Sequence, residues 1–187
     1  MNALAQPKMT VDEFLAWADG REGRWELRDG VPVAMSPERV IHGATKFSAG
    51  TALRDALQAA SLSCETFVDC LAVRVDQHKT FQPDVVVNCG ERLGPDVMEA
   101  PNPVIVVEIL SPSTRARDLG LKVRRYFDLP SIHHYLILDA DSRSVIHHAR
   151  GTGDALVTRI VSEGVLRFDP PGFAVEARSL FPEPYEG

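Results

Sequence analysis

PVIVVEIL, residues 103–110, combines a run of aliphatic residues with one glutamate. Its run of valine and isoleucine predicts a strand that is buried on both faces. Glu108 lies near the end of this strand, and an isolated buried carboxylate is very costly unless it is paired, hydrated or bound to a metal. We therefore expect another part of the chain to supply a partner for Glu108.

The composition is that of a globular protein with one core. The chain has 187 residues, of which 44% are hydrophobic and 25% charged, so we expect residues 1–187 to form a single domain. Its apolar runs are far shorter than the ~20 residues that span a bilayer, and its first residues lack the apolar segment of a secretory signal. Three cysteines without a CxxC spacing predict reduced thiols and a cytoplasmic location.

The charge of the chain is acidic overall but basic in one segment. A net charge of −6 and a pI of about 5.5 argue against a protein that coats nucleic acid without regard to sequence. Residues 115–125 contain one acid, Asp118, and five cations. The cations are Arg115, Arg117, Lys122, Arg124 and Arg125. Two interpretations stay open, a phosphate-binding surface and a solvated helix face.

The order of the expected elements predicts an α/β chain in which helices flank a mixed sheet. Thr10 and Glu13 form a capping box, Asp29-Gly30 is a strong hairpin turn, and Ser36-Pro37 is typical of a helix start. One strand–helix–strand unit is expected at 103–139. Helices are expected at 11–18, 36–60 and 113–128, and strands on both sides of the hairpin turn and at 64–76 (one or two), 84–88, 103–110, 133–139, 143–149, 155–162 and 165–168.

A second carboxylate follows a proline at the start of the strand 84–88. If this strand pairs antiparallel with 103–110 and Asn88 lies opposite Val104, then Asp84 lies opposite Glu108. Directly opposed side chains share a face, with Cβ atoms about 5 Å apart. Two carboxylates that close repel each other unless one is protonated or a cation lies between them. Oxygen ligands of this kind suit Mg²⁺ or Mn²⁺.

Lys122 is the candidate cation of the following helix. At roughly 100° per residue, Lys122 lies within about 60° of the inward stripe formed by Leu119, Tyr126 and Leu129. An ammonium group on that stripe indicates an anionic partner. The alternative is an i, i+4 pair with Asp118, which is worth only ~0.3–0.5 kcal/mol.

Three segments and His42 resemble the Uma family of restriction-endonuclease-like proteins, a branch of the PD-(D/E)XK nuclease superfamily. The segments are RWELRDGVPVAMSP (24–37), PDVVV (83–87) and VVEILSPSTRARDLGLKVRRYFDLPSIHHYLILD (106–139), and the resemblance extends from about residue 9 to 180. It implies a restriction-endonuclease-like core and a Mg²⁺- or Mn²⁺-dependent endonuclease that hydrolyses phosphodiester bonds in DNA.

The same resemblance implies roles for individual residues. Asp84 and Glu108 match the two metal-binding acids, to which the carbonyl group of Ile109 is added. The superfamily usually has its lysine two residues after the glutamate, where this chain has Leu110, so the catalytic lysine maps to Lys122 of the next helix. The other matched positions are Glu26, as a further metal or water ligand, and His42 and Gln82, as auxiliary residues.

The expected partners are DNA and a second copy of the chain. Four arginines would bind the phosphates of the DNA, and a homodimer is expected because two active sites suit the cutting of a duplex. The arginines are Arg115, Arg117, Arg124 and Arg125. The missing lysine at position 110 favours an alternative, a catalytically inactive nuclease fold that acts as a binding or regulatory module. The pairs His133-His134 and His147-His148 are expected to be core or surface histidines, because neighbours in a strand point to opposite faces.

Overall fold

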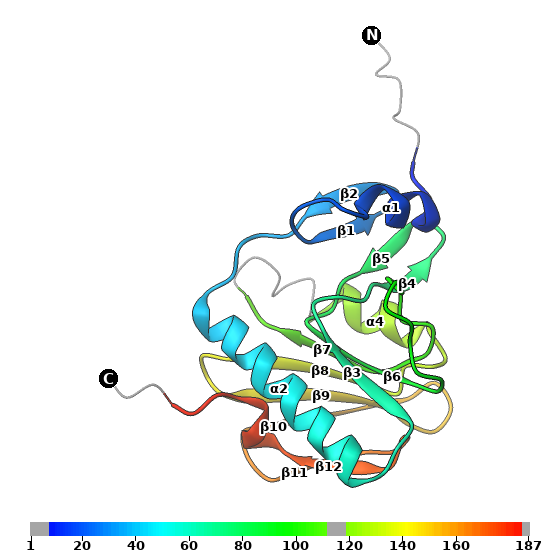
Figure 1. Cartoon of the computed structure of the whole chain (residues 1–187). Helices are drawn as coiled ribbons and strands as arrows, with labels where there is room; N and C mark the ends of the chain where they lie inside the picture. Colours follow the sequence, from blue (N-terminus) through cyan, green and yellow to red (C-terminus); the bar gives the residue numbers. More distant parts are fainter. Residues whose placement is uncertain (1–7, 112–118, 185–187) are drawn as a thin grey trace.

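A six-stranded mixed sheet forms the centre of the molecule (Figure 1). The computed structural model describes residues 8–111 and 119–184. The strands lie in the order β10-β9-β8-β7-β6-β3 across the sheet, which confirms the predicted mixed α/β fold. Their bounds are β3 Cys64–Val68, β6 Val85–Cys89, β7 Pro103–Ile109, β8 His134–Asp139, β9 Ser144–Arg150 and β10 Leu156–Val161.

Strand β7 lies in the middle of the sheet, and all seven of its residues are buried. It pairs antiparallel with β6 and parallel with β8. Parallel neighbours need a crossover connection, which here contains helix α4, Leu121–Phe127. This is the predicted strand–helix–strand unit at 103–139. The helix expected at 113–128 begins at Leu121 in the described part of the chain, and residues 112–118 lie outside it.

The two faces of the sheet pack against different elements. Helix α2, Val40–Ala59, crosses one face, as Figure 1 shows. Val85 and Val87 of β6 point into this layer, whereas Val86 points to the opposite face, where it packs in the same cluster as Tyr126 of α4. The layer under α2 is completed by β11 Val165–Phe168, β12 Phe173–Glu176 and the 3₁₀ helix η1 Ala177–Leu180.

A smaller layer stands at one end of the sheet. It contains helix α1 (Val11–Ala18), the hairpin of β1 (Trp25–Arg28) and β2 (Val31–Ala34), and the neighbouring strands β4 (Val73–Asp76) and β5 (Lys79–Phe81). Backbone amides of the β1–β2 hairpin donate hydrogen bonds to this second pair of strands. One bond goes to a side chain of β5, and another goes to a backbone carbonyl group in the β4–β5 turn. In Figure 1 the hairpin lies beside β5 and above the first turn of α2.

The predicted capping box and hairpin turn are both confirmed. The hydroxyl group of Thr10 accepts a hydrogen bond from the Glu13 amide at 3.3 Å, and the Glu13 carboxylate accepts one from the Thr10 amide at 2.7 Å. In the hairpin, Asp29 and Gly30 have φ values of 50° and 82°, a left-handed conformation that glycine and aspartate tolerate.

Some predicted boundaries are wrong. Helix α2 begins at Val40 with Arg39 as its N-cap, not at Ser36-Pro37. The segment before it is extended, which lets the Glu38 carboxylate reach Lys46 two turns into the helix. The sequence interpretation also missed β5, β12 and η1, which are only three or four residues long.

The prediction of reduced cysteines is wrong for two of the three. Cys64 of β3 and Cys89 of β6 lie directly opposite each other and form a disulfide, whereas Cys70 is free and exposed. Spacing along the chain gave no sign of this pair, because the antiparallel register brings the two residues together across 25 positions. The cysteines therefore no longer indicate a reducing compartment, and a cytoplasmic location stays a prediction.

Within the described ranges, no helix has both the length and the hydrophobicity that crossing a bilayer requires.

Candidate active site

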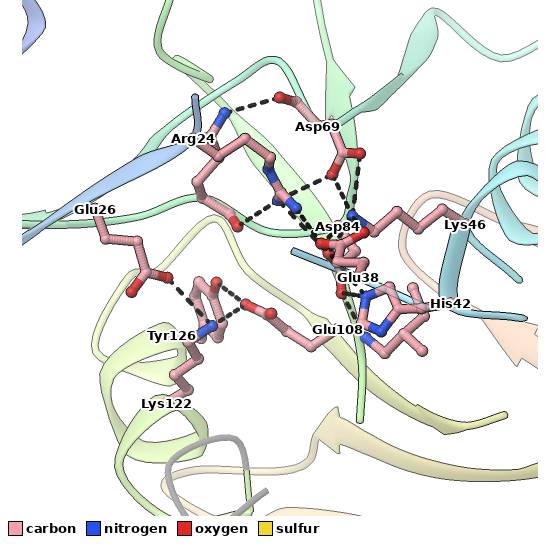
Figure 2. A network of polar contacts seen from close by, with 12 residues as sticks. Arg24, Glu26, Glu38, His42, Lys46, Asp69, Asp84, Glu108, Lys122 and Tyr126 are labelled. Atoms are coloured by element: carbon pink, nitrogen blue, oxygen red, sulfur yellow. Dashed lines mark hydrogen bonds and ion pairs between the residues drawn. The ribbon is translucent and has the colours of Figure 1, made fainter. Parts of the chain in front are cut away.

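A pocket of about 470 Å³ opens where the ends of β6 and β7 meet the segment that leads into α2. Its polar lining includes Glu38, His42, Asp84, Glu108 and Lys122. The two acids and the lysine that the sequence singles out therefore line the same pocket. Two clusters of charged side chains meet there, and Figure 2 shows them side by side.

The register of β6 and β7 places Asp84 beside Glu108. Val86 lies opposite Val106, as predicted, but a register shift puts Asn88 opposite Pro103 rather than opposite Val104. At the other end of the pair, the Asp84 amide donates to the Val107 carbonyl at 3.1 Å, and the Ile109 amide donates to Asp84 Oδ2 at 2.7 Å. These two bonds hold Asp84 across from Glu108 even though Asp84 precedes the strand.

The first cluster, called the Asp84 cluster, is centred on the ammonium group of Lys46. Lys46 Nζ lies 3.0 Å from Asp84 Oδ1, 2.7 Å from Glu38 Oε1 and 2.9 Å from Asp69 Oδ1. A guanidinium group bridges the same acids, because Arg24 contacts Glu38 at 2.6 Å and Asp69 at 2.9 Å. The members of the cluster are Arg24, Glu38, His42, Lys46, Asp69 and Asp84 (Figure 2).

Asp84 is held in its charged form by these neighbours. Burial raises the pKa of its carboxyl group, but the adjacent His42 ring and the charge of Lys46 outweigh burial and hold the pKa well below its ordinary value. His42 Nε2 lies 3.3 Å from Asp84 Oδ2 and 3.7 Å from Glu38 Oε1. Within the described part of the chain, this nitrogen is buried and has no well-aligned hydrogen-bond partner.

The donors around His42 fit a divalent cation. One oxygen of Glu38, one oxygen of Asp84 and a ring nitrogen of His42 all lie within 4.8 Å of one another. Carboxylate oxygens suit Mg²⁺ and Mn²⁺, and an imidazole nitrogen suits transition metals. The buried Nε2 is the observation that favours a metal here, because a polar atom without a partner is costly to bury.

The second cluster, called the Glu108 cluster, consists of Glu26, Glu108, Lys122 and Tyr126. Lys122 Nζ lies 2.6 Å from Glu108 Oε1 and 3.5 Å from Glu26 Oε1. The Tyr126 hydroxyl group donates to Glu108 Oε1 at 2.7 Å. Burial and the charge of Glu108 raise the pKa of this hydroxyl group well above its ordinary value. The partner that Glu108 needs is therefore an ammonium group and a phenol from α4 (Figure 2).

Helix α4 presents Lys122 to the pocket because of its spacing to Tyr126. Residues four apart lie on one face of a helix, so both side chains point at Glu108. Leu110 stands where the superfamily usually has its lysine, and it packs instead in the apolar cluster on the α4 side of the sheet. Glu26 comes from β1 and also contacts Arg28 at 2.9 Å.

The other residues singled out from the sequence are not members of the two clusters, but Gln82 contacts the Asp84 cluster. The Gln82 side chain donates to the backbone carbonyl of Asp69 at 2.7 Å. Arg124 is exposed on α4, and Arg125 lies 3.6 Å from Asp128. Arg115 and Arg117 lie outside the described residues, as does Asp118, the alternative partner that the sequence offers for Lys122.

Sequence reasoning missed five members of the clusters, Arg24, Glu38, Lys46, Asp69 and Tyr126. Two signals were available. Lys46 follows His42 by four residues on α2, and Tyr126 follows Lys122 by four residues on α4, so each lies on the same helix face as a residue already singled out. Arg24, Glu38 and Asp69 come from separate segments, for which sequence spacing holds no signal.

Of the histidine pairs, His134 and His147 are buried and His133 and His148 are half-buried, and none of them belongs to either cluster. His134 and His147 are buried, and their ring nitrogens share a hydrogen bond of 3.0 Å. Burial lowers the pKa of each to about 4. The two nitrogens that share this proton are therefore not both available to one metal ion.

The central mixed sheet, with acids and a lysine gathered at the ends of two adjacent strands, defines the class of restriction-endonuclease-like folds. The chain belongs to the Uma2 family, whose model, described as "Putative restriction endonuclease", matches residues 11–178. This confirms the resemblance found in the sequence.

The chain is also similar to two relatives and to a solved structure. The protein slr1290 of Synechocystis sp. is 29% identical over 174 residues, covering 91% of this chain and 90% of the relative. A second Synechocystis protein, sll1609, is 24% identical over 159 residues, covering 83% of this chain and 89% of the relative. The crystal structure of a "putative nuclease belonging to DUF820" from Anabaena variabilis superposes with a TM-score of 0.68 at 17% identity, covering 92% of this chain and 97% of that one. At that identity the likeness concerns the fold.

Proposed function

We propose that the chain is a divalent-metal-dependent endonuclease that hydrolyses phosphodiester bonds in DNA. The observation that carries the proposal is one pocket lined by Asp84, Glu108 and Lys122 together, in a chain of a restriction-endonuclease family. Acids that bind a metal and a cation that faces the same space are the two components that this hydrolysis requires.

Asp84 and Glu108, with the Ile109 carbonyl group, would hold Mg²⁺ or Mn²⁺, and His42 would complete the donors on the Asp84 side. When bound, the ion supplies a water molecule of lowered pKa and neutralises charge on the phosphate. The chain's own contribution is to keep the acids ionised. Lys46 does this for Asp84, whose pKa it lowers, and Lys122 faces Glu108 with its ammonium group at 2.6 Å.

Lys122 would also stabilise the negative charge that gathers on the phosphate in the transition state. Glu26 and Tyr126 hold the lysine side of the pocket in place, because both contact the Lys122–Glu108 pair. Glu26 would serve there as a further ligand for the metal or a water molecule. Gln82 braces the backbone of Asp69 and would act only through it.

The charge balance of the pocket favours a divalent cation followed by a phosphate. In the two clusters and Arg28, five carboxylates meet four permanent cations, which leaves one negative charge in excess; Arg39, which also lines the pocket, pairs with Asp141. A divalent ion would turn that excess into one positive charge, which suits a phosphodiester anion. The acids are Glu26, Glu38, Asp69, Asp84 and Glu108, and the cations are Arg24, Arg28, Lys46 and Lys122.

DNA would be bound through its phosphates by arginines of α4 and of the sequence before it. Arg124 and Arg125 lie on α4, the helix that carries Lys122, and Arg115 and Arg117 precede it in the sequence. Contacts of this kind position a duplex without reading its sequence. A homodimer with two such pockets would cut both strands.

A second function, an inactive nuclease fold that binds or regulates, is favoured by one observation. Leu110 occupies the usual lysine position and is buried in the core, so no cation can be supplied from β7. If Lys122 only neutralises Glu108 and Glu26, the pocket lacks a cation for the transition state.

A nicking assay on supercoiled plasmid separates the two functions. Wild type is compared with Asp84→Asn in Mg²⁺, in Mn²⁺ and in EDTA, with linear and single-stranded DNA as further substrates. We expect nicking by wild type with either metal, and none in EDTA or with Asp84→Asn. Asp55→Asn, which changes an exposed acid of α2 outside the pocket, is the matched control and should cut normally. Metal-dependent nicking that survives Asp84→Asn would point to a contaminating nuclease and contradict the proposal.

A further inference from the structure

Lys46 is a buried lysine surrounded by three carboxylates. Its side chain is 3% exposed, and its ammonium group makes hydrogen bonds of 2.5–3.1 Å to four oxygen atoms of Glu38 and Asp69. Asp84 Oδ1 lies 3.0 Å away on a further side. A single positive charge thus sits where three acids converge.

This surrounding resembles that of a metal ion more than that of an ordinary ion pair. Mg²⁺ and Mn²⁺ are bound by carboxylate oxygens that converge from separate segments, and Glu38, Asp69 and Asp84 come from three such segments. A lysine ammonium group is a compact point charge with three donors, so it satisfies the same oxygens without a metal.

The two oxygens of Asp84 have different partners. Oδ1 faces Lys46, with Arg24 at 3.5 Å, whereas Oδ2 accepts from the Ile109 amide and lies next to His42. The side of Oδ2 is therefore the one that can take an ion together with His42, and the side of Oδ1 already has a cation.

We infer that Lys46 is a resident cation that fills a second cation position, so that the pocket takes one divalent ion where some nucleases take two. Lys46 is a positioning residue: it fixes Asp84 through Oδ1 and leaves Oδ2 for the ion. The inference deepens the proposed function, and it rests on that function only for the ion count of the wild type. Its distinctive consequence is that loss of the ammonium group creates a divalent-ion site.

The test is the number of Mn²⁺ ions bound per chain, measured by titration from the electron paramagnetic resonance signal of free Mn²⁺. Wild type is compared with Lys46→Met, which keeps the length of the side chain but removes its charge. We expect one additional Mn²⁺ per chain in Lys46→Met, and the wild-type number in Lys46→Arg, which restores the charge. A purely structural role would not raise the number of bound ions.

Lys79→Met is the matched control. Lys79 is also buried, but it pairs with the single carboxylate of Asp29 at 2.8 Å, so its loss should create no site. An equal ion count in Lys46→Met and wild type overturns the inference, as does a wild type that already binds two ions in the pocket. A wild type that binds none, with a variant that binds one, supports the role of Lys46 and contradicts the metal in the proposed function.

Folding of the variant is measured separately, by circular dichroism with and without Mn²⁺. If Lys46→Met fails to fold, Lys46→Gln replaces it, because the amide group still donates hydrogen bonds to the acids. An ion that takes the place of the ammonium group should also rescue folding. Failure of both variants to fold even with Mn²⁺ would contradict the inference.

Discussion

The Asp84 cluster and the Glu108 cluster each surround one lysine with carboxylates, but several of their carboxylates differ in exposure to water. In the Glu108 cluster, the side chains of Glu26, Lys122 and Glu108 are 0%, 1% and 4% exposed. In the Asp84 cluster, those of Glu38 and Asp69 are 27% and 36% exposed. Water weakens the attraction between charges, so an equal distance means a stronger interaction in the Glu108 cluster.

This difference in exposure determines in which cluster a change of charge has its larger effect. Removing one partner of a buried ion pair leaves an uncompensated charge in a medium that solvates it poorly. In the Asp84 cluster, water and the remaining cations can replace a partner that an exposed member such as Asp69 loses. We therefore expect matched substitutions to cost more stability and more activity in the Glu108 cluster.

The largest effect is expected for Lys122→Met. Loss of one well-placed cation typically costs 3–4 kcal/mol of transition-state stabilisation, so cleavage of plasmid should fall by roughly 10²–10³-fold. The free energy of unfolding should also fall by about 3–5 kcal/mol, because Glu108 loses the ammonium group at 2.6 Å while it stays buried, and Glu26 keeps Arg28. Single-turnover cleavage and urea unfolding measure the two effects.

A double variant separates catalysis from stability in this case. Glu26→Gln combined with Lys122→Met removes one charge of each sign and should regain part of the lost stability without regaining activity. If Lys122→Met cuts as well as wild type, the lysine only neutralises its acids, and the inactive-module function is favoured.

The next largest effect is expected on reduction of the Cys64–Cys89 disulfide. A crosslink that closes a loop of this length is worth about 3 kcal/mol, and the two cysteines are 25 positions apart. The loss should concern the Asp84 cluster, because β6 has only the edge strand β3 on its outer side. Hydrogen exchange with and without reductant should show faster exchange in β6 than in β7. Cys70→Ser removes the third thiol as a control, and unchanged stability on reduction would contradict the expectation.

The sequence predicted the Glu108 cluster better than the Asp84 cluster, for a physical reason. Glu108 and Lys122 belong to one strand–helix–strand unit and are 14 positions apart, so strand and helix periodicity were enough to orient both. The register of β6 against β7, which the predicted pairing of Asp84 with Glu108 takes as a condition, holds at Val86 and Val106. The register shift at Asn88 could not be predicted, because an irregularity in strand pairing leaves the sequence pattern of the preceding residues unchanged.

The Asp84 cluster depends on contacts that no local pattern records. Arg24, Glu38, Lys46 and Asp69 come from four segments, and they meet only when α2 packs on the sheet beside the N-terminal hairpin. The helix start expected at Ser36 also placed Glu38 inside the helix, whereas the extended segment before Val40 turns its carboxylate toward Lys46.

A smaller effect is expected for Tyr126→Phe, which removes one hydrogen bond to Glu108 and keeps the ring against Phe81 and Tyr135. Hydrogen bonds to charged groups are worth about 1.5–3 kcal/mol, so the free energy of unfolding should fall by that amount. Cleavage should fall less than in Lys122→Met, because the cation remains. Urea unfolding and single-turnover cleavage measure both, and a loss of activity as large as that of Lys122→Met would mean that the hydroxyl group takes part in the reaction.

The smallest effect is expected for Asp69→Asn in the Asp84 cluster, the counterpart of Tyr126→Phe in the Glu108 cluster. Lys46 keeps Glu38 and Asp84 as partners when Asp69 loses its charge. Half-exposed ion pairs are worth about 0–1 kcal/mol, so stability should change by less than about 1 kcal/mol and cleavage by less than roughly fivefold.

The direction of this small change follows from the pKa of Asp69. Burial raises the pKa of its carboxyl group by more than Lys46 and Arg24 lower it. The folded chain therefore favours the protonated form, so the stability that Asp69 contributes is present at low pH and falls as the pH rises through the raised pKa. At neutral pH, Asp69→Asn should accordingly be neutral or slightly stabilising, and its difference from wild type should shrink as the pH is lowered. Urea unfolding of the variant and of wild type, at neutral pH and at successively lower pH values, measures the difference in their free energies of unfolding. A loss of several kcal/mol at neutral pH would show that the Asp84 cluster is as strongly coupled as the Glu108 cluster, and the contrast between them would not hold.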